Sequence, residues 1–312
     1  MRTRLAALAT VTALALVAGC GGEPSSDPAG SPSASPRVPS SSPVPSPTTV
    51  PLDDASVPLS DRLTQAMATV AAGEPGAEDV REAALFEQTT ARDLARGSKA
   101  KADEVLGALG RADRAQLQSD IAAARELMVM TDPQPELPDW KILTPPTPDE
   151  LRPLYRKAQQ QTGTPWEYLA AVHLVETRMG RIRGTSTAGA QGPMQFLPST
   201  FAQYGAGGDI NDPADAIMAA GRMLANNGAP GDMAAGRMLA NNGAPGDMAG
   251  ALWSYNHSDR YVAAVSAYAE QMKRSPAAYH LYWHWQVLYR HQDRTMLLPE
   301  GYPQKKPVRI AD

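Results

Sequence analysis

The 312-residue chain contains one cysteine, Cys20, and its aromatic content is only 6%. A single thiol cannot close a disulfide within the chain, so a disulfide framework is excluded. The formal net charge is −4, which also excludes the strongly basic surface typical of nucleic-acid-binding proteins. Mild acidity gives no attraction to an anionic polymer, so recognition of such a polymer has to come from a cleft.

Long hydrophobic runs are scarce as well. The apolar run Leu5–Val17 follows Arg2 and Arg4 and is too short for a resident transmembrane helix, which is typical of a signal peptide. Its end, Leu-Val-Ala-Gly-Cys at residues 16–20, resembles the lipobox of bacterial lipoproteins. The resemblance implies cleavage before Cys20, a diacylglycerol on its sulfur and attachment to the outer face of the cell membrane. An ordinary export signal followed by an unmodified thiol is the alternative.

Proline and serine dominate residues 21–58, which contain no aromatic side chain. Such a segment cannot build a core, so we expect a disordered tether. As a partly polyproline chain at about 3.1 Å per residue, it reaches at most roughly 120 Å. That length is enough to hold a domain away from the membrane.

Helical periodicity dominates residues 59–131, as in the spacing of Leu117, Ile121 and Met128, with glycine interruptions at Gly73, Gly97 and Gly110. We predict three or four helices packed as a small bundle, for which the sequence indicates no chemistry. Proline then returns, and the predicted organisation is a signal peptide (1–19), a tether (20–58), the helical bundle (59–131), a Pro-rich linker (132–147) and a second domain (148–312).

Two capping boxes with proline at the first helical position predict helix starts in this second domain, at Thr147–Glu150 and at Thr164–Glu167. The second of these helices is expected to run to Met179 and to end at Gly180. Its apolar residues share one face, and Glu176 projects from that same face while Glu167 and Arg178 lie opposite. The apolar residues are Tyr168, Leu169, Val172, Val175 and Met179.

A carboxyl group on a core-facing stripe is costly to ionise. Glu176 is therefore either paired or carries a pKa raised toward neutrality, as a general acid requires. The alternative is that Glu176 lies at the margin of the stripe and reaches water.

Three ordered motifs resemble those of the lytic transglycosylases: Glu176-Thr177, then Gly-Ala-Gln-Gly-Pro-Met-Gln at 189–195, then Ser-Tyr-Asn at 254–256. The resemblance implies a mainly α, lysozyme-like fold related to the goose-type lysozymes, with a long saccharide cleft for peptidoglycan strands and no cofactor. It also implies that Glu176 is the catalytic acid and base, and that the hydroxyl of Tyr255 contacts its carboxyl. Asn256 is expected to orient the acetamido group of the substrate. The full set of implied substrate-binding residues is Ser186, Met194, Gln195, Tyr255 and Asn256.

Most glycosidases use two carboxylates, and a second one is not obvious here. Asp212 reads better as a helix cap before Pro213, and Asp259 is the only other candidate we retain. Substrate assistance resolves the shortage, because the acetamido oxygen of an N-acetylmuramic acid (MurNAc) residue can attack its own anomeric carbon. A lytic transglycosylase leaving 1,6-anhydro ends is therefore the leading hypothesis. A hydrolytic muramidase and a non-catalytic wall-binding lipoprotein are the alternatives.

A metal site is weakly indicated by His280 and His284, whose spacing suits two ligands on a helix. The surrounding Tyr282, Trp283 and Trp285 favour a packing helix over residues 279–289 instead, so we expect no metal. The expected partners are peptidoglycan strands and the membrane, with no nucleic acid and an unidentified partner for the bundle.

An unusual feature is an identical repeat: residues 219–233, AAGRMLANNGAPGDM, recur unchanged as residues 234–248. Each copy contains a helical segment, a stop at Asn-Asn-Gly and a new start at Pro-Gly-Asp. We expect the extra copy to extrude at the surface, because lengthening a loop adds little closure entropy. Distortion of the site by the insertion is the alternative.

Overall fold

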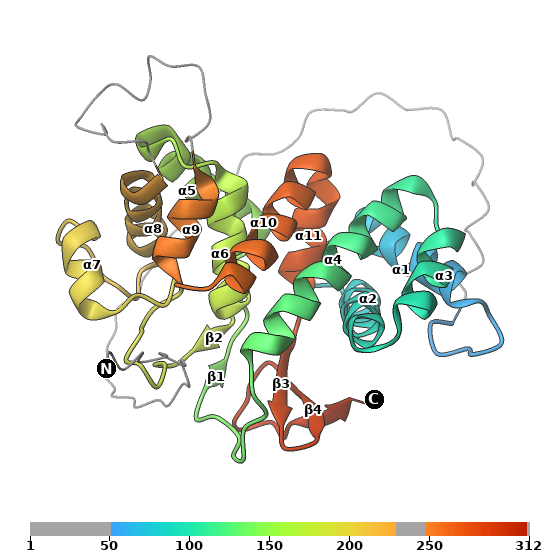
Figure 1. The fold of residues 1–312 in the computed structure, drawn as a ribbon. Helices are drawn as coiled ribbons and strands as arrows, with labels where there is room; N and C mark the ends of the chain where they lie inside the picture. Colours follow the sequence, from blue (N-terminus) through green and yellow to red (C-terminus); the bar gives the residue numbers. More distant parts are fainter. Residues whose placement is uncertain (1–50, 229–246, 311–312) are drawn as a thin grey trace, which may run out of the picture.

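The computed structural model describes residues 51–228 and 247–310, and this part is mainly helical, with two small sheets (Figure 1). The expected signal peptide, Cys20, most of the tether and the middle of the repeated segment lie outside the described residues. Within the described ranges no helix has both the length and the apolar character needed to cross a membrane.

The first four helices confirm the helical prediction for residues 59–131. They are α1 (Leu59–Ala72), α2 (Glu78–Arg96), α3 (Lys99–Ala108) and α4 (Arg111–Met130). Gly73 and Gly97 follow the ends of α1 and α2, and the hydroxyl of Ser98 accepts a hydrogen bond from the backbone of Lys101 to start α3. Leu63, Leu94 and Leu117 are buried in a core that these helices share.

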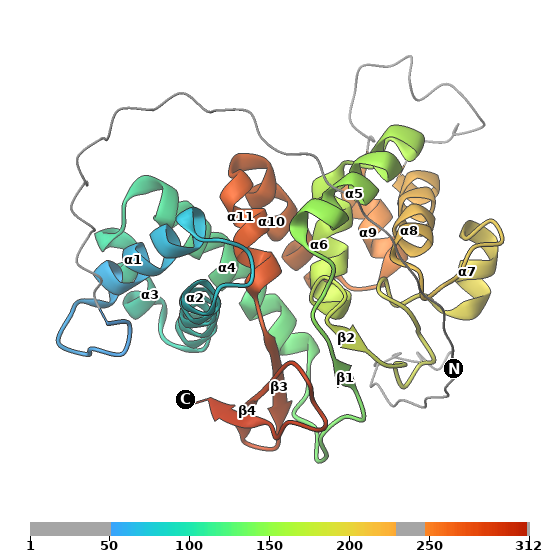
Figure 2. The same cartoon turned by 180° about the vertical axis from the view of Figure 1, so that it is seen from behind.

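These helices also share a core with the second half of the chain. Helix α4 packs along α10 (Asp259–Arg274), and α1 and α2 pack against α11 (Pro276–His284) (Figures 1 and 2). Val70, Ala84 and Ala123 belong to the same buried cluster as Leu169 on α6 (Trp166–Thr177). The four helices are therefore one wall of a larger helical body.

The remaining helices of the second half are α5 (Pro148–Thr162), α7 (Pro198–Tyr204), α8 (Pro213–Gly228) and α9 (Met248–Tyr255). The predicted capping box at Thr147 is confirmed. The one predicted at Thr164 is wrong, because its buried hydroxyl donates to the carbonyl of Gly221 and Pro165 precedes the helix without a side-chain cap. The side chain of Gln159 accepts from the backbone N–H of Trp166 instead.

Helix α6 is the central helix, packed against α5, α8, α10 and α11 (Figure 2). The middle of the helix is buried on every face, because each residue from Tyr168 to Leu174 is buried. The helix ends at Thr177, two residues earlier than predicted, since Arg178 and Met179 adopt left-handed backbone conformations. A helix buried all round carries its last turn into the interior of the protein, and Glu176 lies in that turn.

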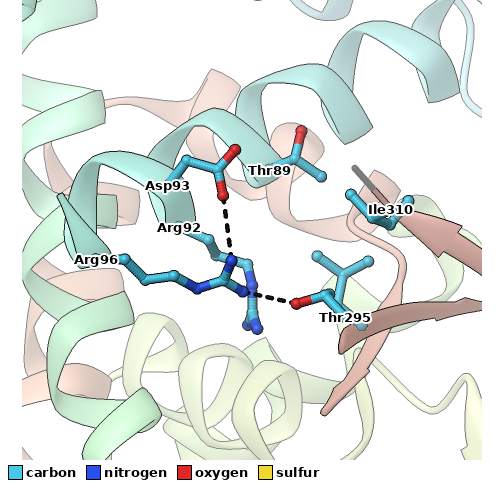
Figure 3. Close-up of a pocket in the computed structure, with 7 residues that line it drawn as sticks. Thr89, Arg92, Asp93, Arg96, Thr295 and Ile310 are labelled. Carbon is cyan, nitrogen blue, oxygen red and sulfur yellow. Dashed lines mark hydrogen bonds and ion pairs between the residues drawn. The ribbon is translucent and has the colours of Figure 1, made fainter. Parts of the chain in front are cut away.

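The strands were not predicted. They are β1 (Lys141–Ile142), β2 (Ile182–Arg183), β3 (Val287–His291), β4 (Arg294–Leu298) and β5 (Val308–Ile310), with β1 antiparallel to β2 and the order β3-β4-β5 in the second sheet. The helix expected over 279–289 ends at His284, although Tyr282, Trp283 and Trp285 are buried as the packing interpretation required. Arg96 of α2 ties this sheet to the first helices, donating to the Thr295 hydroxyl at 2.7 Å (Figure 3).

Two fully buried carboxyl groups join α2, α4 and α11. Asp120 accepts from the Tyr282 hydroxyl at 2.6 Å and from the Gln116 amide at 2.7 Å, and Glu87 accepts from the Trp285 indole at 3.0 Å. Burial raises the pKa of both carboxyls, and that of Glu87 lies well above its usual range because Asp120 is also adjacent. The higher proton affinity of Glu87 makes it the donor in its hydrogen bond with Asp120. We call Glu87 and Asp120 the buried acid pair.

Candidate active site

The Glu176 side chain is held from the opposite helix. Its Oε1 accepts a hydrogen bond from the hydroxyl of Tyr261 at 2.7 Å. Tyr261 lies buried in the first turn of α10, whose start is set by the Ser258 hydroxyl accepting from the Tyr261 backbone N–H at 3.4 Å. One buried phenol thus fixes the orientation of the carboxyl, and the cap of α10 fixes the phenol.

The proton affinity of Glu176 is strongly shifted. Burial raises its pKa to about 7, while the hydrogen bond from Tyr261 acts in the opposite direction. A raised pKa is one of the outcomes expected from the sequence, and the partial exposure of Glu176 agrees with the alternative that it reaches water. A carboxyl that is near half-ionised at neutral pH can donate a proton in one step and take one up in the next.

The end of α6 is locked onto the following loop by Thr177. Its buried hydroxyl donates to the carbonyl of Pro193 at 2.6 Å and accepts from the backbone N–H of Gly180 at 3.1 Å. An apolar side chain here would leave both backbone groups without this partner. The Glu-Thr pair therefore couples an acid to the hydroxyl that positions its helix end.

The loop that Thr177 holds contains three of the expected substrate-binding residues. Ser186 accepts from the Ala190 backbone N–H at 2.8 Å, and the Gln195 amide donates to the Gly192 carbonyl at 3.0 Å. Met194 is fully buried. Gly192 has a positive φ, and a Cβ there would meet the Ile210 carbonyl oxygen at 1.9 Å, so only glycine fits. Ser186 and Gln195 thus shape the loop in this structure.

Tyr255 lies close to Glu176 but does not bond to it. Its hydroxyl donates to the Met194 carbonyl at 2.6 Å, and its ring stacks on Tyr261 with centroids 6.3 Å apart. The pKa of Tyr255 is raised by burial and then by the charge of Glu176. The contact expected between Tyr255 and the catalytic carboxyl is therefore made by Tyr261 instead.

Asn256 follows at the end of α9, where its backbone N–H donates to Leu252. The structure brings Glu176, Met194 and Tyr255 together around Tyr261, which the sequence interpretation missed. Tyr261 has the spacing of an ordinary core residue with Val265 and Tyr268, so periodicity alone gave no signal.

Other candidate groups have other roles. Asp212 caps α8 by accepting from the backbone of Ala214 and Asp215, as predicted. Asp259 is an exposed residue at the start of α10. Of the residues that the structure describes, no three His, Cys, Asp or Glu side chains come together as metal ligands.

Comparison with known proteins gives one match. The family model of the transglycosylase SLT domain matches residues 153–276. No curated protein and no solved structure matches the chain. The matched segment starts within α5 and contains Glu176, Gln195, Tyr255 and Tyr261, whereas α1 to α4 lie before it. Residues 153–276 are therefore a transglycosylase SLT domain, and the protein is a peptidoglycan enzyme of the lytic transglycosylase type, a lyase acting on glycan strands.

Proposed function

We propose that the protein cleaves the bond between MurNAc and N-acetylglucosamine and leaves 1,6-anhydro ends. The observation that carries the proposal is Glu176, a carboxyl with a pKa of about 7 held by one phenol. Among the described residues, no second carboxylate contributes to the raised pKa of Glu176. An acid without a partner nucleophile suits a reaction in which the substrate supplies its own nucleophile.

The first step breaks the glycosidic bond. The acetamido oxygen of MurNAc bonds to its own anomeric carbon, while protonated Glu176 gives its proton to the leaving glycosidic oxygen. Tyr261 keeps the carboxyl in one orientation during this transfer and bonds more strongly to the carboxylate that results.

The second step closes the anhydro ring. The Glu176 carboxylate takes the proton of the MurNAc 6-hydroxyl, and that oxygen displaces the acetamido oxygen from the anomeric carbon. Glu176 returns to its protonated form, and no water is consumed. If water entered instead, the product would be a reducing end and the enzyme a muramidase.

Digestion of purified peptidoglycan, followed by mass spectrometry, tests the proposal. Anhydromuramyl ends support it, whereas reducing ends identify a muramidase and binding without products identifies a non-catalytic wall-binding protein. Glu176→Gln should abolish product formation, and Glu167→Gln, at the opposite end of the same helix, is the matched control.

We also propose that a lipid on Cys20 holds the enzyme at the outer face of the membrane, with residues 21–58 as tether. The support is the lipobox-like sequence at residues 16–20. In cells fed a radiolabelled fatty acid, the wild type should carry label and sediment with membranes. Cys20→Ala should lose the label, and a labelled Cys20→Ala protein would exclude this site of attachment.

We further propose that one copy of the repeat is dispensable. Support comes from its described ends: α8 ends at Gly228, Asp247 caps α9 at the backbone of Gly250, and α8 packs against α9. Deletion of residues 234–248 leaves an equivalent sequence in place, so cleavage should be unchanged or faster. Loss of activity with an unchanged fold would exclude surface extrusion.

A further inference from the structure

Helix α4, which lies outside the SLT match, forms an open recess with α10 of the SLT domain. The recess has a volume of about 520 Å³ and is lined by Glu126, Ser258, Asp259, Arg260 and Ala263. It is an open surface recess rather than an enclosed pocket. Its wall is shared between the two parts of the chain.

One end of the recess is close in sequence to residues of the candidate active site. Ser258, at one end, is two residues beyond Asn256 and caps the turn that contains Tyr261. Met130, at the end of α4, contacts the Ser258 hydroxyl at 3.6 Å. Helix α4 therefore reaches the end of the recess that Ser258 lines.

The lining carries both signs of charge. Arg260 pairs with Glu126 at 2.7 Å across the two helices, and both side chains remain partly exposed, at 50% and 34%. Asp259 adds a second carboxylate at the surface. An accessible ion pair of this kind contributes little to stability, and its groups remain available to a ligand with opposite charges.

We propose that this recess binds the peptide stem carried by MurNAc, with Arg260 holding a stem carboxylate and Glu126 or Asp259 holding a stem ammonium group. A strand reacting at Glu176 presents its stems beside the cleft, and a stem carries both kinds of charge. The inference rests on the proposed function. It gives α1 to α4 a role in choosing substrate.

Binding to the Glu176→Gln protein tests the inference without relying on cleavage. Soluble glycan strands with stems, and strands stripped of stems by an amidase, are titrated in a calorimeter. The Glu176→Gln protein should bind the stem-bearing strands about tenfold more tightly, as expected for one charge-assisted contact. Adding Arg260→Ala should remove the preference and leave binding of stripped strands unchanged.

Lys101→Ala is the control, because Lys101 forms an exposed ion pair with Glu104 on α3, away from the recess. It should keep the preference. Equal affinity for the two kinds of strand, or a preference that survives Arg260→Ala, overturns the inference. Failure of the wild type to cleave either strand would instead reject the proposed function, and the binding comparison would still decide the recess.

Discussion

In the part of the chain that the structure describes, carboxyl groups are buried at the end of α6 and between α2 and α4, and the two places differ in how the carboxyl groups are paired. At the end of α6, Glu176 is alone, partly exposed and bonded to one phenol. Between α2 and α4, Glu87 and Asp120 are fully buried and surrounded by donors from α4 and from the end of α11. Burial raises the pKa in both places. A raised pKa therefore indicates only that a carboxyl group is buried. A catalytic acid differs from a structural one in that it can also contact the substrate.

The partners of each acid show the difference. In the buried acid pair, Asp120 accepts from Tyr282, Gln116 and Glu87, so its proton affinity is used to join helices. Glu176 has a single donor and stands in the last turn of α6, where the helix dipole also disfavours a negative charge. Its proton remains available for transfer.

The largest difference is expected between glutamine substitutions of Glu176 and of Glu87. Glu176→Gln should reduce kcat by about 10²- to 10⁴-fold, because it removes the proton donor. Glu87→Gln should leave kcat within about twofold, because an amide can replace the donor in the buried acid pair. Turnover of purified peptidoglycan measures both. Comparable losses in the two variants would show that the distinction between the two places is wrong.

The pH profile separates the two places within one protein. The pKa of Glu176 is raised to about 7, and the first step needs its protonated form. The value of kcat/KM should therefore fall as pH rises through 7, by about tenfold per pH unit above it. The Glu87→Gln variant should show the same profile. If the alkaline side of the pH profile shifted to another pH in this variant, the buried acid pair would control the activity.

Removal of the Tyr261 hydroxyl tests how the orientation and the pKa of the Glu176 carboxyl are set. Tyr261→Phe should lower kcat by about tenfold, because the carboxyl loses its orienting bond. The Tyr261 hydroxyl holds the pKa of Glu176 down against burial, so the alkaline limb should move to higher pH. Tyr255→Phe is the control, since its hydroxyl bonds to the Met194 carbonyl. A merely structural role for Tyr261 would lower the rate without moving the limb.

The smallest effect concerns stability. The pKa of Glu87 is higher in the folded protein than in the unfolded chain, so the folded state binds more protons and stability falls as pH rises above about 4.5. Glu87→Gln removes this proton uptake while keeping a donor for Asp120. The variant should be more stable than the wild type at pH 8 and differ less from it at pH 5. Urea unfolding at both pH values measures this, and parallel pH dependence would refute it.

Two helix caps of the second domain could be predicted from the sequence alone. Thr147 and Asp212 cap helices because a hydroxyl or carboxylate one residue before a helical proline has few other roles. The raised pKa of Glu176 followed from an acid within an apolar pattern. Thr164 misled because its hydroxyl found a distant carbonyl on α8, which no local pattern encodes.

The sequence by itself determined the mainly helical character and the caps at Thr147 and Asp212, because capping and periodicity act over a few residues. Only the tertiary structure decided that Tyr261 rather than Tyr255 holds Glu176. It alone packed α4 onto α10 and closed the buried acid pair. Such contacts between residues far apart in the chain depend on how whole helices pack, and burial within that packing sets the proton affinity of each acid.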